Sequence, residues 1–254
     1  MLLSIAVVST LLTAGGLEGA VPGKAPILGL ASIDAGFIVG TESGVYVSAN
    51  GKSWSKGAEL AGKPVLVTGV GRGRAAILAG GRLYDARRLS GFLKGQGAPQ
   101  RAVALAGDPA GSIYISSDSG HLLTVAPGGD FTTQTLGGGP DEVVALDVVP
   151  PNTQAIFTGG LNSGVWRRPV GEKWRQILKT PTRAVLVDDK DPRRIFIATA
   201  GGILVSKNQG LSWLFTEMRL PVEALAQHGA TYFALGENRL LYKSADGRAW
   251  NVAI

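Results

Sequence analysis

The chain has 254 residues with 37 glycines, 45 % hydrophobic and 17 % charged residues, a composition that excludes a disordered chain and is typical of short strands joined by tight turns. It contains no cysteine, which excludes disulfides, thiolate metal sites and a cysteine nucleophile. The formal net charge of +6 favours an acidic partner or a membrane surface, but no run of lysine and arginine alternates with aromatic residues, so we expect no nucleic-acid binding.

The first residues form an apolar stretch, with no charged residue from Leu2 to Ala14. Such a stretch is typical of a secretory signal peptide, and it is too short to span a bilayer as a helix. We therefore interpret residues 1–20 as a signal peptide or N-terminal apolar segment, and residues 21–254 as a single domain. No lysine or arginine follows Met1, so an alternative stays open in which this segment forms strands of a partial seventh blade.

A short glycine-linked strand pair recurs six times along the rest of the chain. Its copies start 40, 37, 42, 40 and 37 residues apart, at Phe37, Ile77, Tyr114, Ile156, Phe196 and Phe233. A period near forty residues is typical of a β-propeller blade. The sequence therefore predicts an all-β, six-bladed β-propeller with four-stranded antiparallel blades.

The innermost strand of each blade is expected to be rich in small and β-branched residues, because six such strands converge on a narrow axis. These strands are predicted to begin near Ile27, Val65, Ala102, Val143, Ala184 and Val222. In the fifth blade the outermost strand is predicted over 211–218. The turn after the fifth innermost strand carries Asp188, Asp189 and Asp191, which we interpret as solvated turn formers.

A second pattern follows the third strand of several blades, and it predicts a hairpin turn. It reads SANGKSW from Ser48 to Trp54, SKNQGLSW from Ser206 to Trp213, and SADGRAW from Ser244 to Trp250. The acceptors of turn amides are expected to be Asn50, Asn208 and Asp246, and the positive-φ residues Gly51, Gly210 and Gly247. The tryptophans, with Trp174 in a degenerate copy and Phe92 and Phe131 as replacements, are expected to lie between neighbouring sheets.

These turns resemble the Asp-box of bacterial neuraminidase repeats. Propellers with Asp-boxes include sialidases, sortilin-type receptors, xyloglucan-active glycosidases and the photosystem II stability and assembly factors of cyanobacteria and chloroplasts. The resemblance covers Pro26 to Ile254 and implies a β-propeller fold. Because all these classes share the Asp-box, it does not indicate which of their functions the chain has.

A catalytic function would require the residues of a known mechanism to be present in the sequence. The resemblance to sialidases implies an Arg-Ile-Pro motif, which is absent, and Tyr46, Tyr84 and Tyr242 lie in third strands, where we expect them to pack. Asp141 and Glu142 have no facing acid at an equivalent blade position. His121 and His228 are too few for a metal cluster. We predict no catalytic residue, no metal and no cofactor, with a sugar-binding or sialidase-type glycosidase propeller as the alternative.

The remaining candidate is a protein-binding surface where one blade crosses over to the next. Alignment of the blades places Arg101, Glu142 and Arg183 at one equivalent position, and Lys94, Arg219 and Arg239 in crossovers or a nearby turn. We predict that this basic set binds an acidic peptide terminus or loop, because the planar fork of arginine fits a carboxylate. The alternative is an ion-pair network of Arg101, Glu142 and Arg183 that only ties blades together.

Among the Asp-box propellers, the assembly-factor class is the one that this chain resembles most. The resemblance implies an exported binding module without enzymatic activity, in the periplasm, the thylakoid lumen or outside the cell. Its partner would be an integral membrane protein or a membrane complex, and a glycan is the alternative ligand.

Overall fold

The computed structural model describes residues 19–71, 73–97, 101–135, 139–140, 142–149 and 154–253. The prediction of a signal peptide therefore lies outside the described residues, apart from Gly19 and Ala20. Asp141 also lies outside them, as does the side chain of Lys94.

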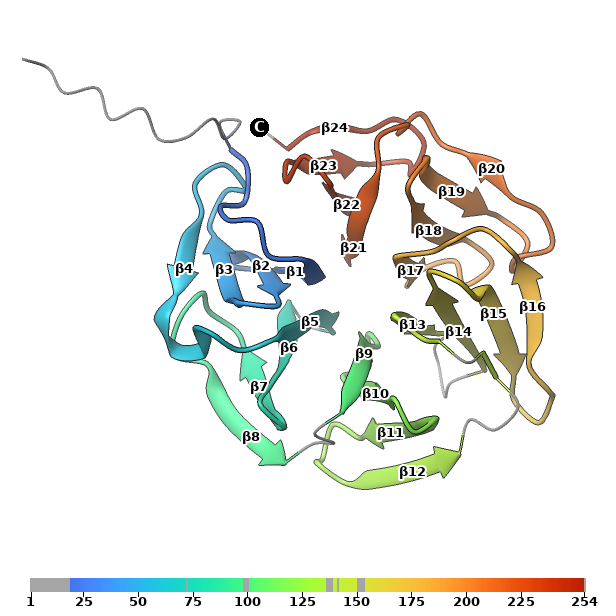
Figure 1. The fold of residues 1–254 in the computed structure, drawn as a ribbon, viewed down its shortest axis with the longest axis horizontal. Helices are drawn as coiled ribbons and strands as arrows, with labels where there is room; N and C mark the ends of the chain where they lie inside the picture. Colours follow the sequence, from blue (N-terminus) through green and yellow to red (C-terminus); the bar gives the residue numbers. More distant parts are fainter. Residues whose placement is uncertain are drawn as a thin grey trace, which may run out of the picture.

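Six four-stranded antiparallel sheets surround a central axis, as Figure 1 shows, and the predicted six-bladed β-propeller is confirmed. Blade one contains β1 (Ile27–Ile33), β2 (Gly36–Thr41), β3 (Gly44–Ser48) and β4 (Ser55–Gly57), followed by the 3-10 turn η1 (Ala58–Leu60). Blade two contains β5 (Val65–Val70), β6 (Arg74–Ala79), β7 (Arg82–Ala86) and β8 (Leu93–Gly97). Blade three contains β9 (Ala102–Gly107), β10 (Ile113–Ser117), β11 (His121–Val125) and β12 (Phe131–Thr135).

The second half of the ring follows the same order. Blade four contains β13 (Ala145–Val148), β14 (Ala155–Gly160), β15 (Gly164–Pro169) and β16 (Arg175–Leu178). Blade five contains β17 (Ala184–Val187), β18 (Ile195–Thr199), β19 (Gly202–Ser206) and β20 (Leu214–Phe215), and blade six contains β21 (Val222–His228), β22 (Thr231–Gly236), β23 (Leu241–Ser244) and β24 (Asn251–Val252). Five innermost strands begin at the predicted residue, and the fourth begins two residues later than predicted.

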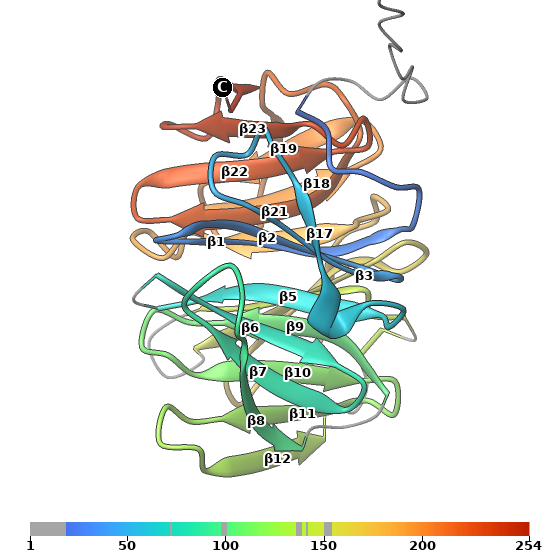
Figure 2. The same ribbon diagram turned by 90° about the vertical axis from the view of Figure 1, so that its left-hand side faces the viewer.

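The core lies between neighbouring blades, because each sheet buries both faces of its inner strands. In blade one, for example, Ile38 and Val45 are fully buried and share a cluster with Val65 and Ile77 of blade two. Small and β-branched residues fill these interfaces, where the sheets approach most closely. Figure 2 shows the ring from the side, with blade one between blade six and blade two.

The ring closes between blade six and blade one without exchange of a strand among the described residues, because residues 222–252 supply all four strands of blade six. The segment before β1 seals this junction. The buried Val21 donates its backbone N–H to the carbonyl of Arg239 at 2.9 Å. Phe37 and Phe233 meet edge to face across the same junction, with ring centroids 4.9 Å apart.

Two predictions about the outer edge of the ring are wrong. The outermost strand of blade five is only Leu214–Phe215, which is shorter than the predicted 211–218. Phe131 does not lie between sheets as predicted: it is 40 % exposed, because all five residues of β12 are exposed at the edge of blade three. Along the described ranges, no helix has the length and apolar character needed to cross a membrane.

Candidate functional site

The turns between third and fourth strands are held by serine and by asparagine or aspartate. We call the turns at Ser48–Trp54, Ser206–Trp213 and Ser244–Trp250 the rim turns. In the first, the Ser48 hydroxyl accepts the Gly51 N–H at 2.8 Å, and Asn50 Oδ1 accepts the Lys52 and Ser53 N–H groups at 2.8 and 3.0 Å. Gly51 has φ +77°, a left-handed conformation that glycine adopts without strain.

The other two rim turns repeat this arrangement. The Ser206 hydroxyl accepts the Gly210 N–H and the Ser244 hydroxyl accepts the Gly247 N–H, at 2.8 and 2.9 Å. Asn208 Oδ1 accepts the Ser212 N–H at 2.9 Å. The N–H groups of Arg248 and Ala249 bind Asp246 and hold the pKa of its carboxyl below the usual range.

Four tryptophans pack beside these turns, each between its own blade and the preceding one. Trp54 contacts the cluster shared by blades six and one, and its indole N–H is 3.1 Å from the Gly19 carbonyl. Trp174, Trp213 and Trp250 occupy the corresponding positions in blades four, five and six. Because neither the rim turns nor these rings line the central cavity, their observed contacts are structural.

The candidate site for ligands is the central channel, a cavity of about 610 Å³ between the innermost strands. These strands all run in the same sense along the axis. We therefore call the end where they begin the start mouth and the end where they finish the end mouth. Arg183 and Glu223 line the cavity toward the start mouth, and Asp34, Asp108 and Asp189 line it toward the end mouth.

At the start mouth, the predicted residues Arg101, Glu142 and Arg183 do not bind one another. The Arg183 guanidinium contacts Glu223 of blade six at 2.6 Å, Arg101 lies 3.6 Å from Asp118, and Glu142 accepts the Asn162 N–H at 2.7 Å. The alternative of one ion-pair network among the three is therefore wrong, because each side chain has a nearer partner. Only Arg183 lines the cavity, whereas the Arg101 side chain is 83 % exposed.

The other predicted partner-binding residues separate in space. The Arg219 guanidinium lies over the Phe215 ring, 4.5 Å from its centroid, and the residue is exposed. Arg239 has φ +64° and donates to the carbonyl of Ala25 at the junction of blades six and one. The prediction that Lys94 lies in a crossover is wrong, because it belongs to β8, the outermost strand of blade two. Arg239 thus supports ring closure, while Arg101 and Arg219 are exposed at the surface.

At the end mouth, the structure gathers carboxylates that the sequence did not single out as a site. Asp34 comes from blade one, Asp108 from blade three, Asp147 from blade four, and Asp188 with Asp189 from blade five. The repeat offered a signal for them, because four of these aspartates directly follow an innermost strand or the residue after it. The remaining one, Asp147, interrupts an apolar run inside β13.

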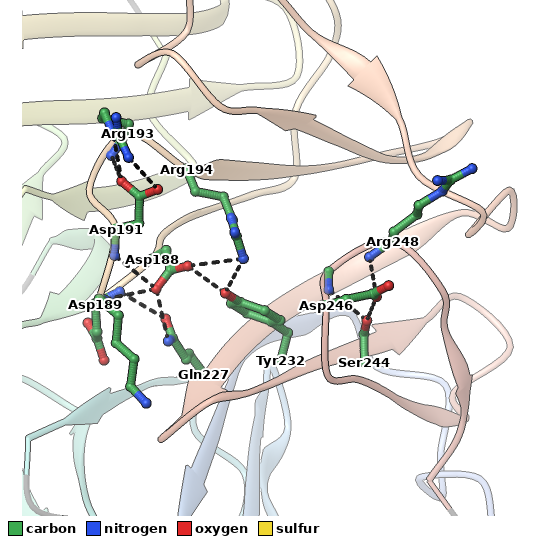
Figure 3. A network of polar contacts seen from close by, with 12 residues as sticks. Asp188, Asp189, Asp191, Arg193, Arg194, Gln227, Tyr232, Ser244, Asp246 and Arg248 are labelled. Carbon is green, nitrogen blue, oxygen red and sulfur yellow. Dashed lines mark hydrogen bonds and ion pairs between the residues drawn. The ribbon is translucent and has the colours of Figure 1, made fainter.

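Asp188 forms the turn as predicted, since its Oδ1 accepts the Lys190 N–H at 2.8 Å, but it is only 2 % exposed, so the prediction that it is solvated is wrong. Figure 3 shows the polar side chains that surround it. Its Oδ2 accepts the hydroxyl of Tyr232 at 2.5 Å and lies 3.6 Å from Arg194, and its Oδ1 accepts an N–H of Gln227 at 3.2 Å. Burial is sustained because these donors satisfy both oxygens, and the contacts join blade five to blade six.

Asp147 joins blade four to blade five in a similar way. Its Oδ1 accepts the Val148 N–H at 2.8 Å, and its Oδ2 accepts the Val187 N–H of β17 at 2.6 Å. Burial and the nearby carboxylates of Asp189 and Asp108 raise the pKa of Asp147 to about 8. With both oxygens bonded to the backbone, Asp147 has no free oxygen for a substrate.

Asp189 differs from its buried neighbours. Partial burial and the carboxylates of Asp188 and Asp108 raise its pKa to about 6. Its backbone N–H donates to Gln227 Oε1 at 3.0 Å, and its side chain points away from the Asp188 network (Figure 3). Asp191 instead pairs with Arg193 at 2.9 Å on the surface, and this arginine keeps the pKa of Asp191 below the usual range.

The histidines do not form a metal centre with these acids in the described ranges. His228 lies 3.4 Å from Asp34, and His121 is exposed beside Ser119. No group of three histidine, aspartate or glutamate side chains is placed to hold a metal ion within the part of the chain that the structure describes.

Comparison with known proteins relates the fold to solved propellers. No family model and no curated protein matches the chain. The extracellular domain of the putative one component system BT4673 from B. thetaiotaomicron is similar with a TM-score of 0.57 and 14 % identity, over 92 % of this chain and 34 % of that one. The chain thus spans about a third of the BT4673 domain.

Two structures of YCF48 are also similar. YCF48 bound to D1 peptide has a TM-score of 0.54 and 16 % identity, over 83 % of this chain and 74 % of that one. YCF48 from Cyanidioschyzon merolae has a TM-score of 0.54 and 11 % identity, over 91 % of this chain and 86 % of that one. At these identities the similarity shows a shared propeller fold.

Proposed function

We propose that the chain is a non-enzymatic binding module that holds a protein partner on the start-mouth face of its ring. The observation that carries this proposal is the position of Arg101, Arg183 and Arg219, which precede the innermost strands of blades three, five and six. The crossovers between blades lie on one face of the ring, so these three guanidinium groups belong to the same face. An acidic loop or a chain terminus fits such a set, because guanidinium forks bind carboxylates in two parallel hydrogen bonds.

The observed pairs leave donors free for such a partner. A guanidinium has five N–H groups, and the Arg183 contact with Glu223 uses the NH1 end. The Arg219 guanidinium lies over the Phe215 ring, 4.5 Å from its centroid, and this contact with the ring uses none of its N–H groups in an ion pair. Arg101 is 83 % exposed, and its contact with Asp118, at 3.6 Å, is weak.

The similar structures support binding of a peptide by a ring of this kind. YCF48 was solved bound to D1 peptide, and the BT4673 domain is extracellular. Together with the rim turns that resemble Asp-boxes, they support an exported module that serves as an assembly factor or accessory subunit of a membrane protein complex. In this proposal residues 1–20 direct export, and the partner-binding set also includes Glu142, which precedes β13, and Lys94 of β8.

The test is capture of partners from solubilised host membranes with the full-length chain carrying a C-terminal tag. The altered bait carries Arg101→Glu together with the exchange Arg183→Glu and Glu223→Arg, which keeps an ion pair between blades five and six. The matched control is Arg175→Glu on the rim, where Arg175 pairs with Glu172 at 3.2 Å. Both baits lower the formal net charge by 2, so a general charge effect acts equally on them.

The expected result is a membrane protein that the native bait and the Arg175→Glu bait retain and the altered bait loses. Purified partner and chain should then bind with an affinity that the altered bait lowers by about tenfold or more, as for loss of charge-assisted hydrogen bonds. Equal capture by all three baits would refute the assignment of this face. Capture of glycan in place of protein would favour the sugar-binding alternative.

A further inference from the structure

Blade two carries the net charge of the whole chain. Residues 61–97, which form this blade, include seven lysines and arginines and a single acid, Asp85, so their formal charge is +6. The rest of the chain has 18 basic and 18 acidic side chains and is balanced. The excess positive charge is therefore a property of one part of the ring, where it creates a local positive potential.

The basic side chains that the structure describes in this blade lie near the two ends of β7. They are Lys63, Arg74, Arg82, Arg87 and Arg88. Arg82 is the first residue of β7, and Arg87 and Arg88 follow its last residue. Five residues along an extended strand separate Arg82 from Arg87 by roughly 17 Å. Because β7 and β8 lie on the outside of the ring (Figure 1), both ends of β7 belong to the outer edge of the blade.

At the second end of β7, two guanidinium groups share one carboxylate oxygen. Arg74 Nη1 lies 3.4 Å and Arg87 Nε lies 3.3 Å from the same atom, Asp85 Oδ2. Arg74 is also fixed by its Nε, which donates to the Gly71 carbonyl at 3.4 Å. One carboxylate offsets only one of the two charges. Arg88 is exposed and forms no ion pair within the described part of the chain, so this end keeps an excess of positive charge.

At the first end of β7, the described charges have no acidic partner. A Cβ placed on Gly80 would lie 3.8 Å from the Lys63 ammonium nitrogen, so this lysine lies beside the hairpin that leads into Arg82. Lys63 and Arg82 are both exposed, and neither forms an ion pair with a residue of the described ranges. The outer edge of blade two is therefore positive at both ends of the strand.

We propose that the outer edge of blade two is a docking surface for an anionic lipid bilayer, whose phosphate groups contact the basic side chains at both ends of β7. Guanidinium groups bind phosphate oxygens through parallel hydrogen bonds. A layer of headgroups presents many phosphates in one plane, so it can contact two basic groups roughly 17 Å apart, which a single small anion cannot. The inference goes beyond the proposed partner at the start mouth and does not depend on it.

The same edge lacks the features that a macromolecular partner of another kind would use. No large apolar side chain of blade two is exposed among those that the structure describes, whereas the core of a protein interface is apolar. This described surface also lacks an exposed aromatic ring on which the bases of a nucleic-acid strand could stack. Lipid headgroups need neither feature, because basic residues bind an anionic surface through charge alone.

The test is co-sedimentation of the full chain with phosphatidylcholine vesicles that contain phosphatidylglycerol, at about 0.1 M salt. The altered protein carries Arg82→Gln, Arg87→Gln and Arg88→Gln. The matched control carries Arg175→Gln, Arg193→Gln and Arg248→Gln in blades four, five and six, where these side chains are 74, 70 and 79 % exposed. Both variants lower the formal net charge by 3, so a general charge effect acts equally on them.

Three further measurements separate the lipid from other causes of binding. Vesicles of phosphatidylcholine alone measure any binding by the apolar residues 1–20, which needs no anionic lipid. A poly-glutamate peptide and a short DNA duplex, each titrated into the native chain, measure binding of an acidic protein segment and of a nucleic acid.

We expect the native chain and the control to bind the anionic vesicles with similar affinity. The altered protein should bind about a hundredfold more weakly, because each basic residue at an anionic surface strengthens binding about fivefold. Raising the salt to about 0.5 M should release the native chain, since salt screens exposed charges. No binding, an equal loss in the control, or equal binding to vesicles without phosphatidylglycerol would overturn the proposal. Binding of the peptide or the duplex in place of the vesicles would overturn the assignment to lipid.

Discussion

The buried Asp147 makes the stability of the ring depend on pH in a way that a substitution can isolate. Its pKa is raised from 3.8 to about 8 in the folded chain, so ionisation favours the unfolded state. The unfavourable contribution is absent below about pH 3.8, grows as the pH rises, and reaches its full size above about pH 8. At about 1.4 kcal/mol for each pH unit, the free energy of unfolding should fall by at most about 4 kcal/mol between pH 5 and 8.

Asp147→Asn removes the ionisation but keeps the side-chain volume. At pH 5 the variant should be less stable than the native chain by about 1–3 kcal/mol, because an amide has one oxygen to accept the Val148 and Val187 N–H groups. As the pH rises, only the native chain carries the growing cost of a buried charge. The difference in the free energy of unfolding should therefore shrink or reverse by pH 8.

The assay is urea unfolding of both proteins at pH 5, 6, 7 and 8. Asp191→Asn is the control, since this surface carboxyl has its pKa lowered by Arg193. Its favourable contribution is complete above the unfolded value and is lost only as the pH falls below it, so its effect should be constant across this range. A difference between native chain and Asp147→Asn that does not change from pH 5 to 8 would show that Asp147 stays ionised and would refute the reasoning.

Two further predictions concern the rim. Trp174→Ala should lower the free energy of unfolding by about 3–5 kcal/mol in urea unfolding, because the ring is only 8 % exposed, whereas Phe131→Ala at the exposed edge should cost less than about 0.5 kcal/mol. Gly247→Ala should lower the thermal stability of the chain more than Gly171→Ala does. Both glycines have φ near +75°, but only at Gly247 would the new Cβ lie 2.4 Å from the Phe196 ring. The backbone strain of alanine at positive φ is about 1–2 kcal/mol in both variants, so an equal loss of stability in the two would contradict the predicted clash with Phe196.

The propeller could be predicted because its determinants are local and repeated. The hairpin glycines and the apolar strands recur at nearly constant spacing, and each blade repeats the evidence of the others. The start of the fourth innermost strand was displaced by only two residues. The prediction that Phe131 lies between sheets was wrong, because the sequence places this aromatic residue on an outer strand but does not show whether the preceding blade covers it.

The end mouth could not be predicted because its contacts join residues from different blades. Asp188 looks like a turn aspartate in sequence, but its environment is set by Tyr232, 44 residues away. Asp147 accepts the N–H of Val187, 40 residues away, which is about one blade period. Such contacts depend on how neighbouring blades are arranged in the closed ring. An alignment of the blade sequences does not show which side chains of neighbouring blades meet.

The carboxylates at the end mouth differ in whether hydrogen bonds compensate for their burial. A buried carboxylate is tolerated where hydrogen bonds satisfy both oxygens, and Asp147 and Asp188 meet that condition through links between blades. Asp189 shares their neighbourhood and its repulsion, but its side chain forms no such link in the described ranges. The raised pKa of Asp189 is therefore the result of partial burial and of repulsion by Asp188 and Asp108, without the hydrogen bonds that compensate the burial of Asp147 and Asp188.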